Sequence, residues 1–205
     1  MVGTLSAPEA VSRRALQRRE TRERIYEAAL QEIGRSGLAA ADVGTITAAA
    51  GVARGTFYFH FPTKEDVLVA LEQCEQLRII ASLERRATSA GDLRVVLAAV
   101  VREVRAAERR LGPRLFRDTL SIHFAPASAD GGRLDDHPLA IFVVNAVREA
   151  RRTGGVRTKV DAHEVALIFL TGLYALLATR GGPSRERDAL LDTYVATILD
   201  GVVTA

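Results

Sequence analysis

The stretch GVARGTFYFHFPTKEDVL, residues 51–68, decides the fold of this chain. The five residues from Phe57 to Phe61 all carry aromatic or imidazole rings, although the 205 residues hold only 7 Phe and 4 Tyr. Pro62 follows them, and a residue that precedes proline disfavours the α conformation. Only a short helix over residues 53–60 therefore fits. A helix this short cannot bury every ring, so some must project outward.

A second short helix is predicted just before this one. Asp42 is a favourable N-cap residue. Val43, Ile46 and Ala49 follow with helical spacing and are expected to be buried. Gly51 should end the helix because glycine readily adopts a positive φ. Two short helices joined by a tight turn form a helix-turn-helix, whose second helix can enter the major groove of DNA.

The second helix is expected to divide its side chains between the core and DNA. Phe57 and Phe61 lie four residues apart and are the predicted core anchors. The polar side chains that cannot share their face are the candidates for DNA contacts: Arg54, Thr56, Tyr58 and His60. Guanidinium groups can bind guanine edges, threonine methyls can contact thymine, and phenol or imidazole groups can bond phosphates. Gly55 leaves space for the backbone to approach DNA.

A longer helix should start after Pro62, with Thr63 as N-cap and Asp66 as the partner in a capping box. Lys64 places a cation where the helix dipole favours an anion, so a bound phosphate would relieve the mismatch. An ordinary surface lysine is the alternative. One apolar face is predicted for this helix: Val67, Leu68, Leu71, Cys74, Leu77 and Ile80.

The rest of the chain has the composition and periodicity of helices. Hydrophobic residues make up 48% and charged residues 26%, and apolar spacings of three and four recur throughout, which predicts an all-α fold. The first helix is expected to start near Thr21, with Thr21 as its N-cap. Residues 1–64 hold nine Lys or Arg against six acids. Several arginines form a basic N-terminal arm that favours a polyanion partner, with a solvated tail as the alternative: Arg13, Arg14, Arg18, Arg19, Arg22 and Arg24.

Residues 21–68 resemble the N-terminal DNA-binding domain of the TetR family of transcriptional regulators. The resemblance is carried by three short segments: TRERI with Ala28, Ala29 and Gly34–Gly37; ITAAAGV at 46–52; and GTFYFHF at 55–61 with Lys64 and Glu65. It implies that Arg54 and Thr56 face the groove, and that Tyr58, His60 and Lys64 hold the DNA backbone. Three further residues complete the expected DNA-contacting set: Thr45, Gly55 and Phe59. Two residues depart from the family pattern: Gly44 replaces a common DNA contact, and Ala53 replaces a hydroxyl residue that caps the recognition helix.

The resemblance also implies three parts: a flexible basic arm over residues 1–20, a DNA-binding domain over 21–62, and a ligand-binding and dimerisation domain over 63–205. Dimers should bind a palindromic operator. The last two helices are the most apolar, which fits either a core or a dimer interface, and the family favours the interface: Leu173, Leu177, Leu191, Tyr194, Val195 and Ile198. The ligand pocket is expected between the long helices of residues 64–177, and the alternative for each candidate is an ordinary core or surface position. The candidates are Cys74, Phe116, His123, Phe124, Phe142, Asn145 and Tyr174.

The sequence does not favour an enzyme. The four histidines and the single Cys74 lack metal-ligand spacing, and no phosphate loop or dinucleotide fingerprint occurs, so neither a metal nor a cofactor is expected. One cysteine cannot form an internal disulfide, which fits a cytoplasmic protein. The apolar run 165–178 is too short to span a bilayer, so no membrane partner is expected. We expect a repressor released by a mainly apolar or aromatic ligand, because few charges are expected inside the bundle. The alternatives are a regulator whose C-terminal domain only dimerises or binds a protein, and a helical enzyme.

Overall fold

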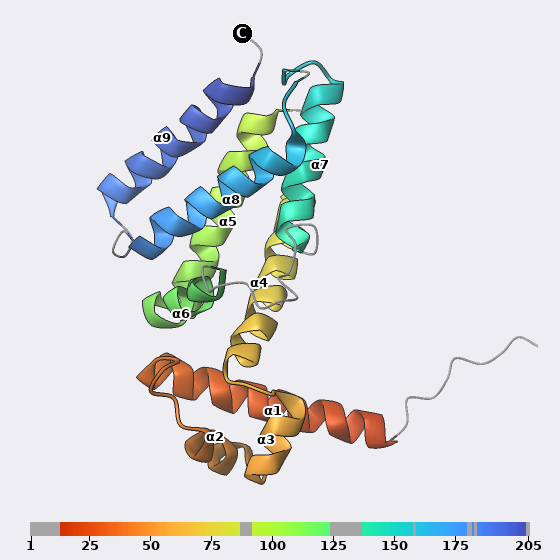
Figure 1. Ribbon diagram of the computed structural model, residues 1–205, viewed down its shortest axis with the longest axis vertical. Coiled ribbons are helices and arrows are strands. Elements are labelled where there is room, and N and C mark those ends of the chain that lie inside the picture. Colours follow the sequence, from red (N-terminus) through yellow and green to blue (C-terminus); the bar gives the residue numbers. More distant parts are fainter. Residues whose placement is uncertain are drawn as a thin grey trace, which may run out of the picture. The chain divides into compact units, whose positions relative to one another are not determined.

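The computed structural model describes residues 13–86, 92–123, 137–157, 159–179, 182 and 184–203. Within these residues the chain forms nine α-helices and one isolated β-bridge between Val156 and Val203 (Figure 1). The helices are α1 (Arg13–Ser36), α2 (Val43–Ala50), α3 (Arg54–His60), α4 (Glu65–Arg86), α5 (Leu93–Leu111), α6 (Pro113–His123), α7 (Pro138–Arg152), α8 (Ala162–Thr179) and α9 (Arg185–Val202). The predicted all-α fold is confirmed.

The chain divides into two compact units. The first ends at Val67, and the second begins at Leu68, so the first turn of α4 belongs to the first unit and its remaining turns to the second. The first unit therefore contains the predicted helix-turn-helix, and the second contains the helices from α5 to α9.

The first unit is built on one small core. Ile25 and Ile33 of α1, Ile46 of α2 and the Phe57 and Phe61 rings are at most 1% exposed. The two phenylalanine rings lie 6.1 Å apart between centroids. The expectation that these rings anchor α3 is confirmed. Truncating a buried Phe to Ala costs about 3–5 kcal/mol, so these anchors account for a large part of the stability of so small a unit.

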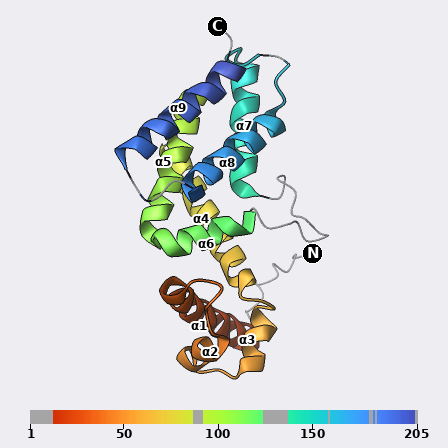
Figure 2. The same cartoon turned by 60° about the vertical axis from the view of Figure 1, so that its left-hand side comes forward.

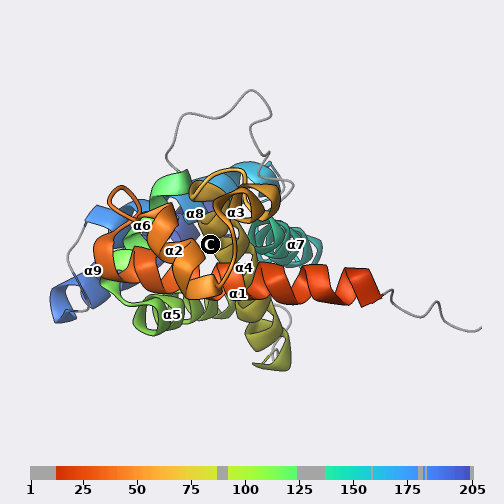
Figure 3. The same cartoon turned by 90° about the horizontal axis from the view of Figure 1, so that it is seen from below.

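Helix α1 is longer than predicted. It begins at Arg13, and Thr21 lies inside it, where its hydroxyl donates to the Gln17 carbonyl at 2.9 Å. The prediction of an N-cap at Thr21 is wrong, because residues 13–20 contain good helix formers and neither Gly nor Pro. The N-terminal turns of α1 extend past α2 and α3 (Figures 1 and 3). Residues 13–20 of the expected arm are thus helical, and residues 1–12 lie outside the described part.

The second unit packs its helices around α5 and α8. Helix α5 contacts α6, α7 and α9, and α8 also contacts these three helices (Figure 2). Leu97 and Val100 of α5, Val143 of α7, and Phe169 and Leu173 of α8 are fully buried. By length and composition α8 alone among the described helices could cross a membrane. Its buried residues instead make it a core helix of this unit.

The buried face of α4 differs from the predicted one. Cys74 is exposed and Leu77 is 59% exposed, whereas Glu72, Glu75 and Ile79 are buried. Hydrophobic spacing alone cannot find a buried face that includes carboxylates. The expectation that Cys74 is part of the core is therefore wrong.

Candidate nucleic-acid interface

Helix α2 is capped at both ends, and its C-cap forms the turn that leads to α3. The Asp42 carboxylate accepts hydrogen bonds from the Thr45 N–H at 2.7 Å and the Thr45 hydroxyl at 3.2 Å, and these bonds lower the pKa of Asp42. Gly51 ends the helix at φ 66°, a conformation that side chains with a Cβ rarely adopt. The predicted caps of α2 are confirmed. Ala49 is exposed instead of buried, and Ala50 takes its place in the core.

Helix α3 presents a polar and aromatic face to solvent. Arg54 and Gly55 are exposed, Thr56 is partly buried, and Tyr58 and Phe59 are 43% and 64% exposed. This face is opposite in character to the buried Phe anchors. It combines donors that can bond bases or phosphates with rings that the core does not require.

Arg54 and Tyr58, two of the predicted DNA contacts, also interact with each other. The Arg54 guanidinium carbon lies 6.0 Å from the centroid of the Tyr58 ring, so the two side chains share one edge of the helix. A side-chain hydrogen bond to Tyr58 raises the pKa of Arg54. Ala53 is the N-cap of α3 and makes no side-chain capping bond. One backbone N–H in the first turn of α3 therefore lacks the side-chain acceptor that a Ser or Thr cap would offer.

Lys64 is occupied within the first unit. Its ammonium donates to the carbonyls of Leu38, Ala39 and Ala41 at 3.0, 3.3 and 2.9 Å. An ammonium has three donors, and all of them serve the loop between α1 and α2. The predicted capping box beside it is confirmed, because the Thr63 N–H donates to Asp66 at 2.7 Å and the Asp66 N–H donates to the Thr63 hydroxyl at 3.2 Å.

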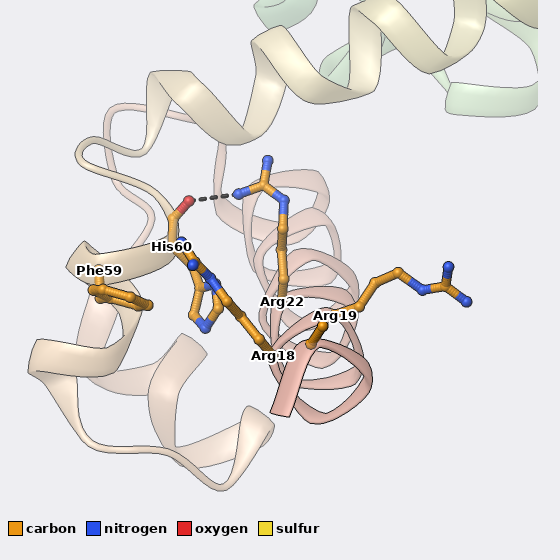
Figure 4. Close-up of a pocket in the computed structure, with 6 residues that line it drawn as sticks. Arg18, Arg19, Arg22, Phe59 and His60 are labelled. Carbon is orange, nitrogen blue, oxygen red and sulfur yellow. Dashed lines mark hydrogen bonds between the residues drawn. The ribbon is translucent and has the colours of Figure 1, made fainter. Parts of the chain in front are cut away.

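Helix α1 adds basic groups beside the end of α3. An open hollow of about 400 Å³, which we call the α1–α3 hollow, is lined by six residues: Ala15, Arg18, Arg19, Arg22, Phe59 and His60. Arg22 donates to the His60 carbonyl at 2.5 Å, and its guanidinium carbon lies 4.0 Å from the Phe61 centroid. The Arg18 guanidinium carbon lies 4.8 Å from the Phe59 centroid. Figure 4 shows Arg18 and Arg22 directed toward α3, while Arg19 extends away from it.

The α1–α3 hollow also affects His60. Burial lowers the pKa of the imidazole, and the charges of Arg18 and Arg22 lower it further. The sequence pattern predicted only that Arg18 and Arg22 belong to a basic arm, and it did not predict their contacts with α3. Their spacing of four residues was the available signal, because it places both on one face if the helix continues upstream of Thr21.

The predicted ligand residues of the second unit do not form one set. Phe116 and Tyr174 are buried, and Phe142 is partly buried. Asn145 and Cys74 are exposed. Phe124 and the side chain of His123 lie outside the described part of the structure.

Buried polar groups contradict the expectation that few charges occur inside the second unit. Glu108 accepts two hydrogen bonds from Arg187, at 2.7 and 2.6 Å, and both side chains are almost fully buried. Glu72 accepts from Gln76 at 2.6 Å. The pKa of Tyr174 is raised mainly by burial and also by the charge of Glu72. The unit can therefore offer hydrogen bonds as well as apolar contacts.

The predicted dimer residues are mostly internal. Leu173, Leu177, Leu191 and Val195 are at most 7% exposed within one protomer, so these four belong to its core. This outcome was the alternative left open by the apolar pattern. Ile198 is partly buried.

Tyr194 joins α9 to α8. It is partly buried, and its hydroxyl donates to the carbonyls of Ile168 and Phe169 at 2.8 Å each. Burial raises the pKa of this phenol to about 12. The exposed apolar side chains of α8 are Leu167 at 50% and Ile168 at 57%.

Comparison with known proteins agrees with the geometry of the first unit. Residues 25–71 match the bacterial regulatory proteins of the tetR family. The HTH-type transcriptional regulator AcrR from Shigella flexneri is 34% identical over 96 residues, which are 44% of this chain and 45% of AcrR. The match thus spans less than half of that relative's length.

Two of the solved structures that resemble this chain cover most of its length. FadR from Thermus thermophilus, a transcriptional repressor in complex with lauroyl-CoA, is 22% identical, with 90% of this chain and 96% of FadR covered at a TM-score of 0.74. FadR from Bacillus subtilis, in complex with stearoyl-CoA, is 17% identical, with 87% and 98% covered at a TM-score of 0.62. At these identities the likeness shows the fold, a helix-turn-helix domain followed by a helical domain.

Proposed function

Because its N-terminal domain makes the chain a member of the TetR family of bacterial regulatory proteins, we propose that it is a transcriptional repressor that binds a palindromic operator as a homodimer. The observation that carries this proposal is α3, whose buried Phe57 and Phe61 fix a helix with Arg54 and Tyr58 exposed. The family consists of regulators, not enzymes, and such a regulator acts in the cytoplasm.

Residues on α2 and α3 take different parts in this proposal. Arg54 and Thr56 read base edges in the major groove, and Tyr58 bonds the DNA backbone. Thr45, at the start of α2, donates its hydroxyl to a phosphate by giving up its 3.2 Å bond to Asp42. Gly55 has no side chain and borders open space, so DNA can approach its backbone closely. Lys64 is left out of the DNA contacts, since its three donors are used inside the unit.

DNA binding is tested by selecting duplexes from a random pool with the purified protein. A repressor of this kind enriches a palindrome, and truncation of Arg54 to Ala costs about 1–3 kcal/mol at one position of each half-site. Arg157→Ala, at an exposed arginine of the second unit, is the matched control. A protein that enriches no sequence, or an Arg54 variant with unchanged preference, contradicts the proposed reading.

The dimer is proposed to form through the outer faces of α8 and α9. Leu167 and Ile168 are large, apolar and exposed in the single protomer, which is typical of a surface covered by a partner. Ile168→Glu should give monomers in sedimentation at low micromolar concentration, because a buried unpaired charge is strongly unfavourable. Leu77→Glu, at an equally exposed leucine on α4, is the control. A dimeric Ile168→Glu protein would place the interface elsewhere.

The proposed effector is a small molecule with a mainly apolar or aromatic body that binds in the second unit. Both FadR relatives hold a fatty acyl-CoA, and Phe116, Phe142 and Tyr174 offer aromatic surface here. Release requires that the effector and DNA favour different conformations. Each ligand then lowers the affinity for the other by the same factor, which corresponds to a coupling free energy of about 1–3 kcal/mol. Titration of the protein–DNA complex with lauroyl-CoA and with small aromatic compounds tests this. If a compound binds equally well with and without DNA, it is not the effector.

A further inference from the structure

We propose that the α1–α3 hollow receives a backbone phosphate of DNA, held by Arg18 on the ring of Phe59, next to the face of α3 that enters the groove. This inference rests on the proposed DNA-binding function. It adds a contact from α1, outside the two helices of the helix-turn-helix.

The geometry of Arg18 suits a phosphate. Its guanidinium carbon lies 4.8 Å from the centroid of the Phe59 ring, within the range of a cation–π contact. A guanidinium that stacks through its face keeps its N–H donors in the plane, where they can form two parallel bonds to a phosphate. Phe59 is 64% exposed, so the ring contributes little to the core. A platform for Arg18 gives this exposed ring a role.

The charges around the hollow favour an anion. Arg22 is already bound to the His60 carbonyl and lies over Phe61, so it holds α1 against the end of α3. Arg18 adds a second positive charge close enough to lower the pKa of His60. Like charges held together by a fold repel each other, and a bound phosphate would reduce this repulsion.

The position of the hollow favours DNA over a free anion. Two of its lining residues, Phe59 and His60, are the last two residues of α3. A strand whose bases meet Arg54 and Thr56 at the start of α3 has phosphates within reach of the end of the same short helix, which spans about 10 Å at 1.5 Å per residue. The hollow is open to solvent, so a phosphate can enter as part of a chain.

Salt-dependent binding separates this contact from its surroundings. Affinity for the selected operator and for a random duplex is measured over a series of salt concentrations, with Arg18→Ala and Arg24→Ala proteins. Arg24 lies on α1 beside a different hollow, so its variant removes the same charge from another side of the helix. Arg18→Ala should weaken both duplexes by similar factors and lower the salt slope by about two in a dimer, about one for each lost phosphate contact. Arg24→Ala should keep the wild-type slope.

A double-mutant cycle tests the platform. Phe59→Ala should weaken DNA binding about 2- to 5-fold for each subunit, the value of an exposed cation–π contact. The loss should vanish in the Arg18→Ala background, because the ring then has no guanidinium to hold. Additive losses would show that Phe59 does not act through Arg18 and would overturn this part. Circular dichroism checks that the Phe59→Ala and Arg18→Ala substitutions leave the helices intact.

The outcomes distinguish this inference from the proposed function. A wild-type protein that binds no duplex contradicts both. A wild-type protein that binds its operator, together with an Arg18→Ala protein of unchanged slope or one that matches Arg24→Ala, refutes only the phosphate contact. Binding of inorganic phosphate to the wild-type and Arg18→Ala proteins is measured as well. If Arg18→Ala weakens phosphate binding but leaves the affinity for both duplexes unchanged, the hollow binds a free anion and the proposed DNA contact is refuted.

Discussion

Replacing Lys64 by methionine should destabilise the first unit without changing the salt dependence of DNA binding. Methionine keeps an unbranched apolar stem and removes the ammonium, which leaves the carbonyls of Leu38, Ala39 and Ala41 without the donor that lies 2.9–3.3 Å away. Hydrogen bonds to charged groups contribute about 1.5–3 kcal/mol each. Leu38 is partly buried and Ala39 is exposed, so water can replace part of this loss.

We therefore expect the free energy of unfolding to fall by about 1–3 kcal/mol in total, less than three full charged bonds. A domain with about 5 kcal/mol of stability stays almost entirely folded after such a loss. Operator affinity at 25 °C should then change little. The unfolding loss is measured by urea denaturation followed by circular dichroism, and the affinity by anisotropy of labelled operator at several salt concentrations.

Lys159→Met is the matched control, because Lys159 is exposed in the second unit and its replacement removes the same charge. The two proteins should have equal salt slopes and different stabilities. A Lys64→Met protein of wild-type stability whose salt slope is lower by about two would refute this reasoning, because that result is expected of a lysine bound to phosphate in each subunit.

Three further predictions concern the core and the histidine. Arg187→Ala should cost the second unit about 3–5 kcal/mol in denaturation experiments, because the Glu108 carboxylate is left buried and unpaired; replacing both residues by apolar ones should cost less, and a larger cost for the double variant would contradict the idea. Gly172→Ala should cost about 1–3 kcal/mol, because the added Cβ would overlap the Tyr194 hydroxyl; the same change in a Tyr194→Ala protein should cost clearly less. His60 has a pKa below its usual value of 6.5, so the unfolded chain takes up its proton first, and stability should fall as the pH drops from about 6.5 through the lower folded pKa. His60→Gln should remove this slope, and an unchanged slope would assign it to other groups.

The helix-turn-helix could be predicted from the sequence because its signals are local. Asp42 and Gly51 cap α2 through bonds within a few residues, and the Thr63–Asp66 box spans three. Phe57 on α3 and Phe61 at its C-cap are large apolar residues four positions apart, so their burial could be predicted from this spacing. The same local reasoning failed at Thr21, a residue type that favours N-caps, because continuation of α1 depends on the residues before it.

Long-range polar contacts explain most of the remaining differences. Lys64 bonds carbonyls 23 to 26 residues away, and Arg187 reaches Glu108 across 79 residues. No spacing in the sequence connects such partners. On α4 the buried carboxylate of Glu75 is paired with Arg110 of α5, and this pairing turns a charged side of the helix inward. The apolar pattern therefore placed Cys74 on the buried face of α4, whereas this residue is exposed.

The bond from Arg22 to the end of α3 has a consequence for how binding specificity can change. Its acceptor is the carbonyl of His60, a group that every amino acid supplies, and the inward anchors are the separate rings of Phe57 and Phe61. The outward side chains of α3 can thus be exchanged without loosening the helix. A new operator preference is reachable by substitutions at residues 54 and 56 alone, which makes this unit a suitable scaffold for directed evolution of sequence recognition.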